Sequence, residues 1–577
     1  MALFSKYLGP GGTALVAMAL AAIMYFASVL WRVRKPMRRV RRLGKPMPQW
    51  SPVFGHLLVA GEIFNSLQVE CHSGYMLRKL LDQFPNNGAF YFDVWPMMEP
   101  MLVVTDAELA NHVVTHHQSG FRKPETLKDW FNPITGGPSL FDTNGQPWKV
   151  LHNLFSPAFS NTNTVAYTPV VVDRIRTFCD ILRDNARRGE VFLLEPLVLN
   201  LVTDIIGEIL LNIRLDSQRQ HHPLSDTMIQ QLKLKFTEYK PQNFFASINP
   251  FLRYRLWNNG RILDQQIRSQ LELRFRVLRT AKRGVADPTA RPGDIPRFKS
   301  VIDLAIEEYL ARSGETPTTL DEDFMAMATR NMRMFFFAGY DSTASTALFC
   351  YYNLWRHPAA LARLRAEHDS VFGPLSSSTS PADAILANPH ILNSLPYTHA
   401  VIKETLRLFP PANGVRQGCP DLELCDARGT RYPTDGFTVL ISHYCIQRDP
   451  RRWSRPDDFV PERWLNGGDV ASDTLDTDSG CLKSQDCQRP PRGGWRPFEH
   501  GPRLCIGQQL VMSEIKAVLA CTVREFDIRD AYDEIGAGAA SRDLSGVGGQ
   551  AAFMIEAGAA HPNGQYPCRV TFSGYGS

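Results

Sequence analysis

Residues 495–510 read WRPFEHGPRLCIGQQL and place one cysteine, Cys505, at the start of a helix-forming run that ends near Ala520. Four residues stand at fixed offsets around this cysteine: Phe498, Gly501, Arg503 and Gly507. A thiolate at a helix start is stabilised by the positive end of the helix dipole, and the two glycines let backbone N–H groups approach the sulfur. We therefore predict that the pKa of the Cys505 thiol is lowered and that its sulfur can bind iron, whereas the other ten cysteines are ordinary packed residues.

The pattern F-x-x-G-x-R-x-C-x-G resembles the haem-binding loop of the cytochrome P450 family, in which the cysteine is the axial thiolate ligand of haem b, iron protoporphyrin IX. The resemblance implies a cytochrome P450 fold and a haem-thiolate monooxygenase activity. It implies that Cys505 ligates the iron, that Arg503 pairs with a haem propionate and that Phe498 shields the sulfur from water. It also assigns Gly501 and Gly507 to the haem-binding loop.

A charge cluster is predicted from two motifs that precede this loop. In VIKETLRLFPP, which starts at residue 401, Glu404 and Arg407 lie three positions apart on a helical segment, so they project from one face and can pair. Arg463 follows in FVPERWL, which starts at residue 459. The three residues resemble the Glu-Arg-Arg triad of the family, which implies a scaffold that braces the haem loop and takes no part in catalysis. A solvated surface pair is the alternative for Glu404 and Arg407 alone.

A long helix is predicted from Thr319 to Arg356, because helical periodicity follows a capping-box pattern at Thr319-Leu320-Asp321-Glu322. It contains FAGYDST, residues 337–343, in which Gly339 costs about 1 kcal/mol relative to alanine in a helix interior. Some feature of the fold must offset that cost. The alternative is an apolar core helix whose polar residues bond to the preceding turn.

The segment FAGYDST is similar to the A-G-x-[DE]-T motif of the family's central helix, which opens locally where dioxygen sits over the iron. The resemblance implies that Asp341 is the acid of a proton relay. Ser342 stands where the family usually has threonine; its hydroxyl can still donate a proton, and Thr343 is a second candidate for that task.

Two haem-edge contacts are also implied by resemblance. Arg416, in the segment that starts at Pro411, matches a family strand whose arginine meets a propionate. Trp148 begins WKVLHNLFSPAFS, which is similar to the family's W-x-x-x-R helix, but His152 stands where arginine is common. The His152 ring can donate to a propionate, with a charge that depends on pH. Core packing is the alternative role for this helix.

The N-terminal segment predicts a membrane anchor. Residues 12–31 form a twenty-residue apolar stretch without a charged side chain, which is long enough to span a bilayer. Eight basic residues follow between positions 32 and 45, and such an excess holds that flank in the cytosol. A cleaved signal peptide is the alternative, but its positive charge would precede the apolar run. We expect a single-pass anchor in the endoplasmic reticulum membrane with the body in the cytosol.

The remaining chain predicts one large globular body. With 44% hydrophobic and 21% charged residues in 577, it is too apolar to be disordered. Eleven cysteines without a C-x-x-C pair argue against a disulfide framework and a zinc ribbon. We predict a mainly α fold with small β-sheets, divided into an anchor at 1–45 and a catalytic domain at 46–577. Helical periodicity dominates 165–212, 224–240, 260–284, 320–356, 358–372 and 395–409, strand-like runs lie near 88–105, 412–442 and 566–573, and loops are expected at 285–297 and 466–494.

The predicted activity is insertion of one oxygen atom from O2 into a small apolar substrate. Since no flavin or nicotinamide module is recognised in the chain, electrons must come from a separate NADPH-dependent flavoprotein reductase, which Arg492 and Arg496 would face. The residues of several motifs resemble those of filamentous-fungal secondary-metabolism members, so a polyketide or terpenoid is expected. Phe335, Phe336 and Phe337, the strand at 412–415 and the loop at 120–146 are expected to contribute to an apolar substrate pocket. The body is mildly acidic, because nine basic residues and no acid lie in 1–45 of a chain of net charge +5, and no nucleic-acid partner is expected.

Three alternatives remain open at this point. A haem-thiolate isomerase or dehydratase would rearrange peroxides without a reductase and would not need the pair of Asp341 and a neighbouring hydroxyl. A fatty-acid hydroxylase would have the same fold and chemistry with a different substrate. A haem carrier or sensor would keep Cys505 but not an oxygen-activating helix.

Overall fold

The computed structural model describes residues 10–67, 71–116, 122–238, 246, 248–282, 298–312, 317–375, 378–465, 492–535, 544 and 547–575. The loop expected at 285–297 lies outside these residues, as does the loop expected at 466–494 except for its last three positions.

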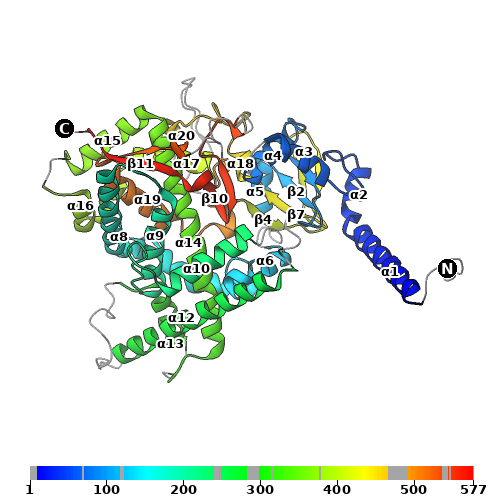
Figure 1. Cartoon of the computed structure of the whole chain (residues 1–577), viewed down its shortest axis with the longest axis horizontal. Coiled ribbons are helices and arrows are strands. Elements are labelled where there is room, and N and C mark those ends of the chain that lie inside the picture. The colour runs from blue at the N-terminus through cyan, green and yellow to red at the C-terminus, as the bar shows by residue number, and fades with distance from the viewer. Residues whose placement is uncertain are drawn as a thin grey trace.

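Helices make up most of the described chain, as predicted (Figure 1). Their bounds are α1 Pro10–Val33, α2 Lys35–Arg42, α3 Leu57–Leu67, α4 Ser73–Leu81, α5 Ala107–Thr115, α6 Glu125–Thr135, α7 Gly145–Phe155, α8 Asn161–Arg188, α9 Leu194–Leu211, α10 Pro223–Lys233, α12 Pro250–Lys282, α13 Val301–Arg312, α14 Glu322–Arg356, α15 Pro358–Phe372, α16 Pro381–Ala387, α17 Pro396–Leu408, α18 His443–Ile446, α19 Gln508–Thr522 and α20 Tyr532–Ile535. Short helical turns add η1 Ser156–Phe159, η2 Leu234–Glu238, η3 Pro389–Ser394, η4 Pro461–Trp464, η5 Gly501–Arg503 and η7 Asn563–Gln565.

The described strands form four small sheets. They are β1 Ala89–Phe92, β2 Met101–Val104, β3 Val191–Leu193, β4 Gly414–Gln417, β5 Glu423–Cys425, β6 Arg431–Pro433, β7 Thr438–Ile441, β8 Phe526–Asp530, β9 Met554–Ala557, β10 Ala559–Pro562 and β11 Pro567–Phe572. The largest sheet has the order β1-β2-β7-β4, with β2 and β7 parallel and the other neighbours antiparallel. The others pair β3-β11-β8, β9-β10 and β5-β6.

The sequence predictions hold for the long elements and fail at some boundaries. The helical range 165–212 is two helices, α8 and α9, separated by the short strand β3. The long helix begins at Glu322, where the Asp321 side chain accepts a hydrogen bond from the Phe324 amide at 2.7 Å. The expected Thr319 cap is therefore wrong by two residues, since the carboxylate of Asp321 satisfies the free amide.

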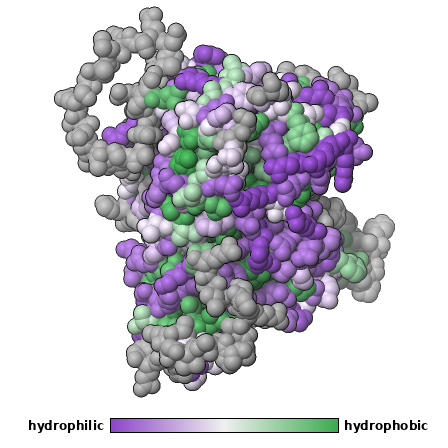
Figure 2. All heavy atoms as spheres, turned by 90° about the vertical axis from the view of Figure 1, so that its left-hand side faces the viewer, coloured by the Kyte–Doolittle hydropathy of each residue, from purple (hydrophilic) through white to green (hydrophobic). Residues whose placement is uncertain are grey.

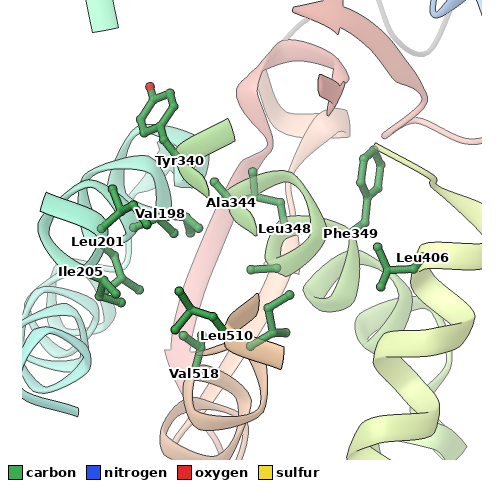
Figure 3. Close-up of a cluster of buried hydrophobic side chains, with 14 of the residues drawn as sticks. Val198, Leu201, Ile205, Tyr340, Ala344, Leu348, Phe349, Leu406, Leu510 and Val518 are labelled. Atoms are coloured by element: carbon green, nitrogen blue, oxygen red, sulfur yellow. The ribbon is translucent and has the colours of Figure 1, made fainter. Parts of the chain in front are cut away.

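Helix α14 is the centre of the hydrophobic core (Figure 3). Its residues Tyr340, Ala344 and Leu348 face α9 and α19, and Phe349 faces Leu406 of α17. The ring of Phe349 also stacks on Phe409 at 4.1 Å between centroids. At 35 residues the helix is about 52 Å long, at 1.5 Å per residue, so it crosses the globule.

Gly339 lets α14 approach α9 closely. A Cβ atom built on Gly339 would lie 2.9 Å from the Cδ1 atom of Ile206 in α9. Close packing between the two helices is therefore the feature that offsets the cost of this glycine inside a helix.

Helix α1 projects away from the globule (Figure 1). Residues Ala14–Val33 have a mean hydropathy of 2.2 and are not buried, so they are long and apolar enough to cross a membrane. Helix α2 behaves differently, because Met37 and Val40 are buried in the core around the largest sheet. Arg34, one of the basic residues expected to face lipid, is instead buried in an ion pair with Asp93 at 3.2 Å. The basic segment thus docks α1 onto the body.

The face opposite α1 is mostly hydrophilic, with smaller hydrophobic areas between (Figure 2). The nine cysteines that the structure describes are all free, as the sequence predicted.

Removing side-chain volume from the buried face of α14 is expected to destabilise the protein. Leu348 is fully buried, so Leu348→Ala should lower the free energy of unfolding by about 2–5 kcal/mol through lost burial and a residual cavity. Leu375→Ala, at an exposed site, is the control and should change it by less than about 0.5 kcal/mol. Urea unfolding followed by circular dichroism measures both, and equal midpoints would contradict this packing.

Candidate active site

The loop before α19 has a backbone shape that requires its first glycine. Gly501 adopts φ +72°, and a Cβ atom there would lie 2.9 Å from the carbonyl oxygen of Val114. The Cys505 amide donates to the Phe498 carbonyl at 2.9 Å, which closes the loop. Gly507 is the N-cap of α19, with an ordinary negative φ, and a Cβ atom there would lie 3.9 Å from the Cys505 sulfur.

Cys505 keeps accessible surface, although the protein around it shields the thiol from water. The residue is exposed by its surface area, yet the surrounding protein raises the pKa of the thiol by desolvation. The amides of Gly507 and Gln508 donate to the sulfur and oppose this rise without cancelling it. The predicted lowering of the pKa is therefore wrong: two N–H groups at a helix start do not outweigh burial. A bound cation can still deprotonate the thiol.

The predicted charge cluster is present and completely enclosed. Arg407 pairs with both carboxylate oxygens of Glu404, at 2.9 and 2.8 Å, and the Arg463 Nε atom donates to Glu404 at 3.1 Å. The Trp464 indole and the Val460 amide also donate to this carboxylate, each at 3.0 Å. Burial alone would raise the pKa of Glu404, but the two guanidinium groups keep it below its ordinary value. A solvated surface pair is excluded.

Gln447 connects this cluster to the cysteine loop. Its backbone carbonyl accepts from Arg407 at 2.8 Å, and its side-chain oxygen accepts from the Arg496 amide at 2.7 Å. On the other side of the loop, the Trp495 indole donates to the Lys403 carbonyl at 3.1 Å, and the Trp495 and Phe498 rings lie 5.9 Å apart. Contacts through Gln447 and Trp495 thus connect the cluster of Glu404, Arg407 and Arg463 to the cysteine loop and support it.

Arg503 and Trp148, each implied at the haem edge by resemblance, lie together in the structure. The Arg503 guanidinium stands 4.4 Å from the centre of the Trp148 ring and donates to the Thr143 carbonyl at 2.6 Å. Burial and the nearby Arg416 lower the pKa of Arg503 to about 9. His152 is half-buried with its ring 5.0 Å from that of Trp148, and its ring nitrogens have no hydrogen-bond partner among the described residues.

Arg416 is fully buried on β4, and its Nη2 atom lies 3.4 Å from Glu499. Burial lowers the pKa of Arg416, and Glu499 opposes that effect. Arg496 is also fully buried and pairs with Glu499 at 3.0 Å. The expectation that Arg496 faces a reductase is therefore wrong, whereas Arg492 is exposed.

The sequence did not predict a role for Lys123, which lies close to Arg416 and Arg503. Burial, with Arg416 and Arg503 close by, lowers the pKa of this lysine well below its ordinary value. Its ammonium group lies 4.9 Å from the centre of the Phe141 ring. No motif marked Lys123, because it precedes α6 in a loop and its neighbours come from distant segments. Two buried basic residues, Lys123 and Arg416, and the half-buried Arg503 share this region with the Glu499 carboxylate, an excess of basic groups that suits an anionic ligand.

The middle of α14 is accessible where the proton relay was predicted. Ala338 is exposed and Phe337, Gly339 and Ser342 are partly so, although most of the helix from Phe324 to Leu354 is buried. The Ser342 hydroxyl donates to the Ala338 carbonyl at 2.8 Å. The Thr343 hydroxyl is buried and has no hydrogen-bond partner among the described residues. Asp341 is buried and its carboxylate turns toward β10.

The local opening expected in this helix is absent, since α14 is continuous from Glu322 to Arg356. Hydrogen bonds from Ser342 to Ala338 and from Thr346 to the Ser342 carbonyl, both 2.8 Å, satisfy the backbone there.

A family model described as cytochrome P450 matches residues 46–534. The cytochrome P450 monooxygenase polC of Polytolypa hystricis is 33% identical over 95% of this chain and 93% of its own length. The cytochrome P450 monooxygenase acrF of Aspergillus aculeatus is 32% identical over 77% of this chain and 85% of its own.

This chain belongs to the cytochrome P450 family. The crystal structure of the cytochrome P450DA heme domain has the same fold, with a TM-score of 0.65 and 19% identity over 92% of this chain and 98% of that one. The chain is an oxidoreductase of the P450 monooxygenase type, related to fungal enzymes, and the predicted P450 fold is confirmed.

The residues present fit the haem-thiolate group that the family implies. An accessible cysteine lies just before α19, and the basic residues Lys123, Arg416 and Arg503 suit the two carboxylates of a haem. Cys505 would hold the iron and the cations would hold the propionates.

Loss of the Lys123 charge is expected to weaken haem binding. Lys123→Met should raise the rate of haem transfer to apomyoglobin roughly 10-fold, equivalent to about 1.4 kcal/mol. Lys128→Met is the control, because Lys128 pairs with Glu125 at the surface of α6. Equal transfer rates for the two variants would show that Lys123 does not contact the haem.

Proposed function

We propose that this chain is a membrane-anchored monooxygenase that inserts one oxygen atom from O2 into a small apolar substrate. Its cofactor would be haem b, bound through Cys505, with electrons supplied by NADPH through a separate flavoprotein reductase. The observation that carries the proposal is the accessible Cys505 sulfur at the start of α19, in a loop braced by the Glu404 cluster.

When bound, a haem-thiolate group supplies reductive activation of O2 and transfer of one oxygen atom. The residues of α14 would take up and transfer the protons. Asp341 takes up protons, and the hydroxyl of Ser342 or Thr343 passes them toward the oxygen-binding side of the helix. Ser342 is the partly accessible one of the two hydroxyls, which favours it for the final transfer.

An aromatic cluster supports an apolar substrate. Phe337 contacts the rings of Phe131 and Phe236, at 5.9 and 5.5 Å between centroids, and Phe141 stands 4.8 Å from Phe131. Phe337 and Phe131 are only partly buried, so apolar surface is available beside Ala338. Phe335 and Phe336, expected in the same pocket, are buried in the core instead. A polyketide or terpenoid suits such a surface, and so does a fatty acid.

The N-terminal region supports an anchor in the endoplasmic reticulum membrane. Helix α1 is apolar and exposed, and Val53, Phe54 and Leu58, which follow the docked α2, expose further apolar surface. We propose a single span with the body in the cytosol, where a reductase on the same membrane could reach it. Arg492 remains a candidate for the docking surface.

The test is turnover of a metabolite panel in membranes that contain the protein and a P450 reductase, under isotopically heavy dioxygen. We expect one heavy oxygen atom in a product that forms only with NADPH. A rearranged product formed from a peroxide without NADPH would instead favour the isomerase or dehydratase alternative. No product and no NADPH use with any metabolite would favour a haem carrier or sensor.

Replacing the relay acid should separate NADPH use from product formation. Asp341→Asn should lower product per NADPH by about 10-fold or more, because the amide cannot carry a proton to the hydroxyl. Asp323→Asn is the control, since Asp323 is exposed in the first turn of the same helix. Unchanged coupling in Asp341→Asn would remove Asp341 from the relay.

A further inference from the structure

The Asp341 carboxylate is bound by a strand from the far end of the chain. One oxygen accepts from the His561 Nε2 atom on β10 at 2.9 Å, and the other accepts from the Ala559 amide on the same strand. One helical turn further on, the Ser345 hydroxyl donates to the Ala560 carbonyl, also on β10. Strand β10 is thus held against α14 at two points, and only one of them uses the His561 ring.

The second nitrogen of His561 meets another carboxylate. His561 Nδ1 lies 2.9 Å from an oxygen of Glu195, which sits in the first turn of α9. His561 and Glu195 are both buried, and neither His561 Nδ1 nor the other Glu195 oxygen has a hydrogen-bond partner among the described residues, so the contact of the ring with Glu195 is an ion pair. The positive end of α9 favours a negative charge on Glu195.

The imidazole ring is charged at neutral pH in this setting. Burial alone would lower the pKa of His561, but Asp341 and Glu195 raise it to about 10. The other titratable groups facing these carboxylates are Tyr340 on α14 and Tyr532 on α20, whose pKa values burial and neighbouring groups raise, so they stay neutral. Opposite His561, β9 presents the apolar Ile555.

We propose that His561 is a positioning residue for oxygen activation: its charged ring, pinned by Glu195, holds the Asp341 carboxylate on β10 in the orientation from which it enters the proton relay. The inference rests on the proposed role of Asp341. An imidazolium carries a proton on both ring nitrogens: Nε2 donates to Asp341, and the Nδ1–H group faces the Glu195 carboxylate 2.9 Å away as an ion pair. A neutral ring has one N–H donor and one lone pair. Deprotonation therefore turns a lone pair toward Glu195 or Asp341, and the Asp341 carboxylate is no longer held in its orientation.

This arrangement predicts a pH dependence that belongs to the pair of His561 and Glu195. Hydrogen peroxide released per NADPH, measured with reductase and no added substrate, reports the share of reduced O2 that leaves with its O–O bond unbroken, which rises when protons are not delivered to the correct oxygen. In the wild type the ratio should be constant between about pH 7 and pH 9, because His561 keeps its proton. In Glu195→Gln the ring loses one of its two anionic partners, so the ratio should rise within that range.

Combining the variants separates positioning from a structural role. Gln places an N–H donor near the position of Nε2 but does not titrate, so His561→Gln should give a ratio that does not change with pH. The double variant of His561→Gln with Glu195→Gln should also be independent of pH. If the rise caused by Glu195→Gln persists in the double variant, or never occurs, His561 does not position Asp341.

Thermal unfolding of the haem-loaded protein gives a second readout that needs no turnover. Because the folded-state pKa of His561 is raised above 6.5, the stability from its charge is complete below about pH 6.5 and is lost as pH rises toward about 10. The Tm difference between wild type and His561→Gln should therefore narrow from about pH 7 to about pH 9. His368→Gln is the control. His368 is also buried, but burial lowers its pKa to about 3, so the Tm difference between wild type and His368→Gln should stay constant from about pH 7 to about pH 9.

The two proposals fail in different ways. If Asp341→Asn leaves the peroxide ratio unchanged, the relay assigned to Asp341 is wrong, and the role of His561 is wrong with it. If Asp341→Asn raises the ratio but the Tm difference stays constant with pH, or Glu195→Gln shows no rise, only the role of His561 is wrong.

Discussion

The carboxylate of Glu404 is the interaction on which the geometry of the site depends. It is fully buried and accepts hydrogen bonds from Arg407, Arg463, Trp464 and Val460. Removing one partner of such a buried pair typically costs about 3–5 kcal/mol, because the remaining charge is left without compensation. Through Gln447 the cluster fixes the backbone of the loop that ends in Cys505. The position of the sulfur is thus set by charges that take no part in the chemistry.

The protein separates its charges into regions with different tasks. Around Glu404, one carboxylate is shared by two guanidinium groups, those of Arg407 and Arg463. Around Lys123, Arg416 and Arg503, positive charge exceeds negative, which suits the propionates of a haem. Around His561, two carboxylates share one imidazolium, which leaves a net negative charge beside the helix proposed to deliver protons. In the proposed haem-thiolate monooxygenase, these three regions would supply a fixed ligand, a counter-charge for the cofactor and a proton source.

The sequence predicted those parts of the site that are encoded as local patterns. The cysteine loop, the Glu404–Arg407 spacing and the central helix were readable because their residues lie within one element. Lys123 and His561 were not, since each acquires its role from segments far away in the chain; His561 lies 220 positions from Asp341. The raised pKa of Cys505 was also beyond local reasoning, because desolvation depends on everything packed around the sulfur. Buried Arg496 and Phe335 show the same limit.

The central claim is that Cys505 is the thiolate ligand of a haem iron, and the absorption spectrum of the reduced protein under carbon monoxide tests it most directly. The wild type should show the red-shifted Soret band characteristic of thiolate ligation, and so should Cys521→Ser, which changes the cysteine near the end of α19. Cys505→Ser should keep haem but lose that band. A red-shifted band that survives in Cys505→Ser, or its absence from folded, haem-loaded wild type, would contradict this account.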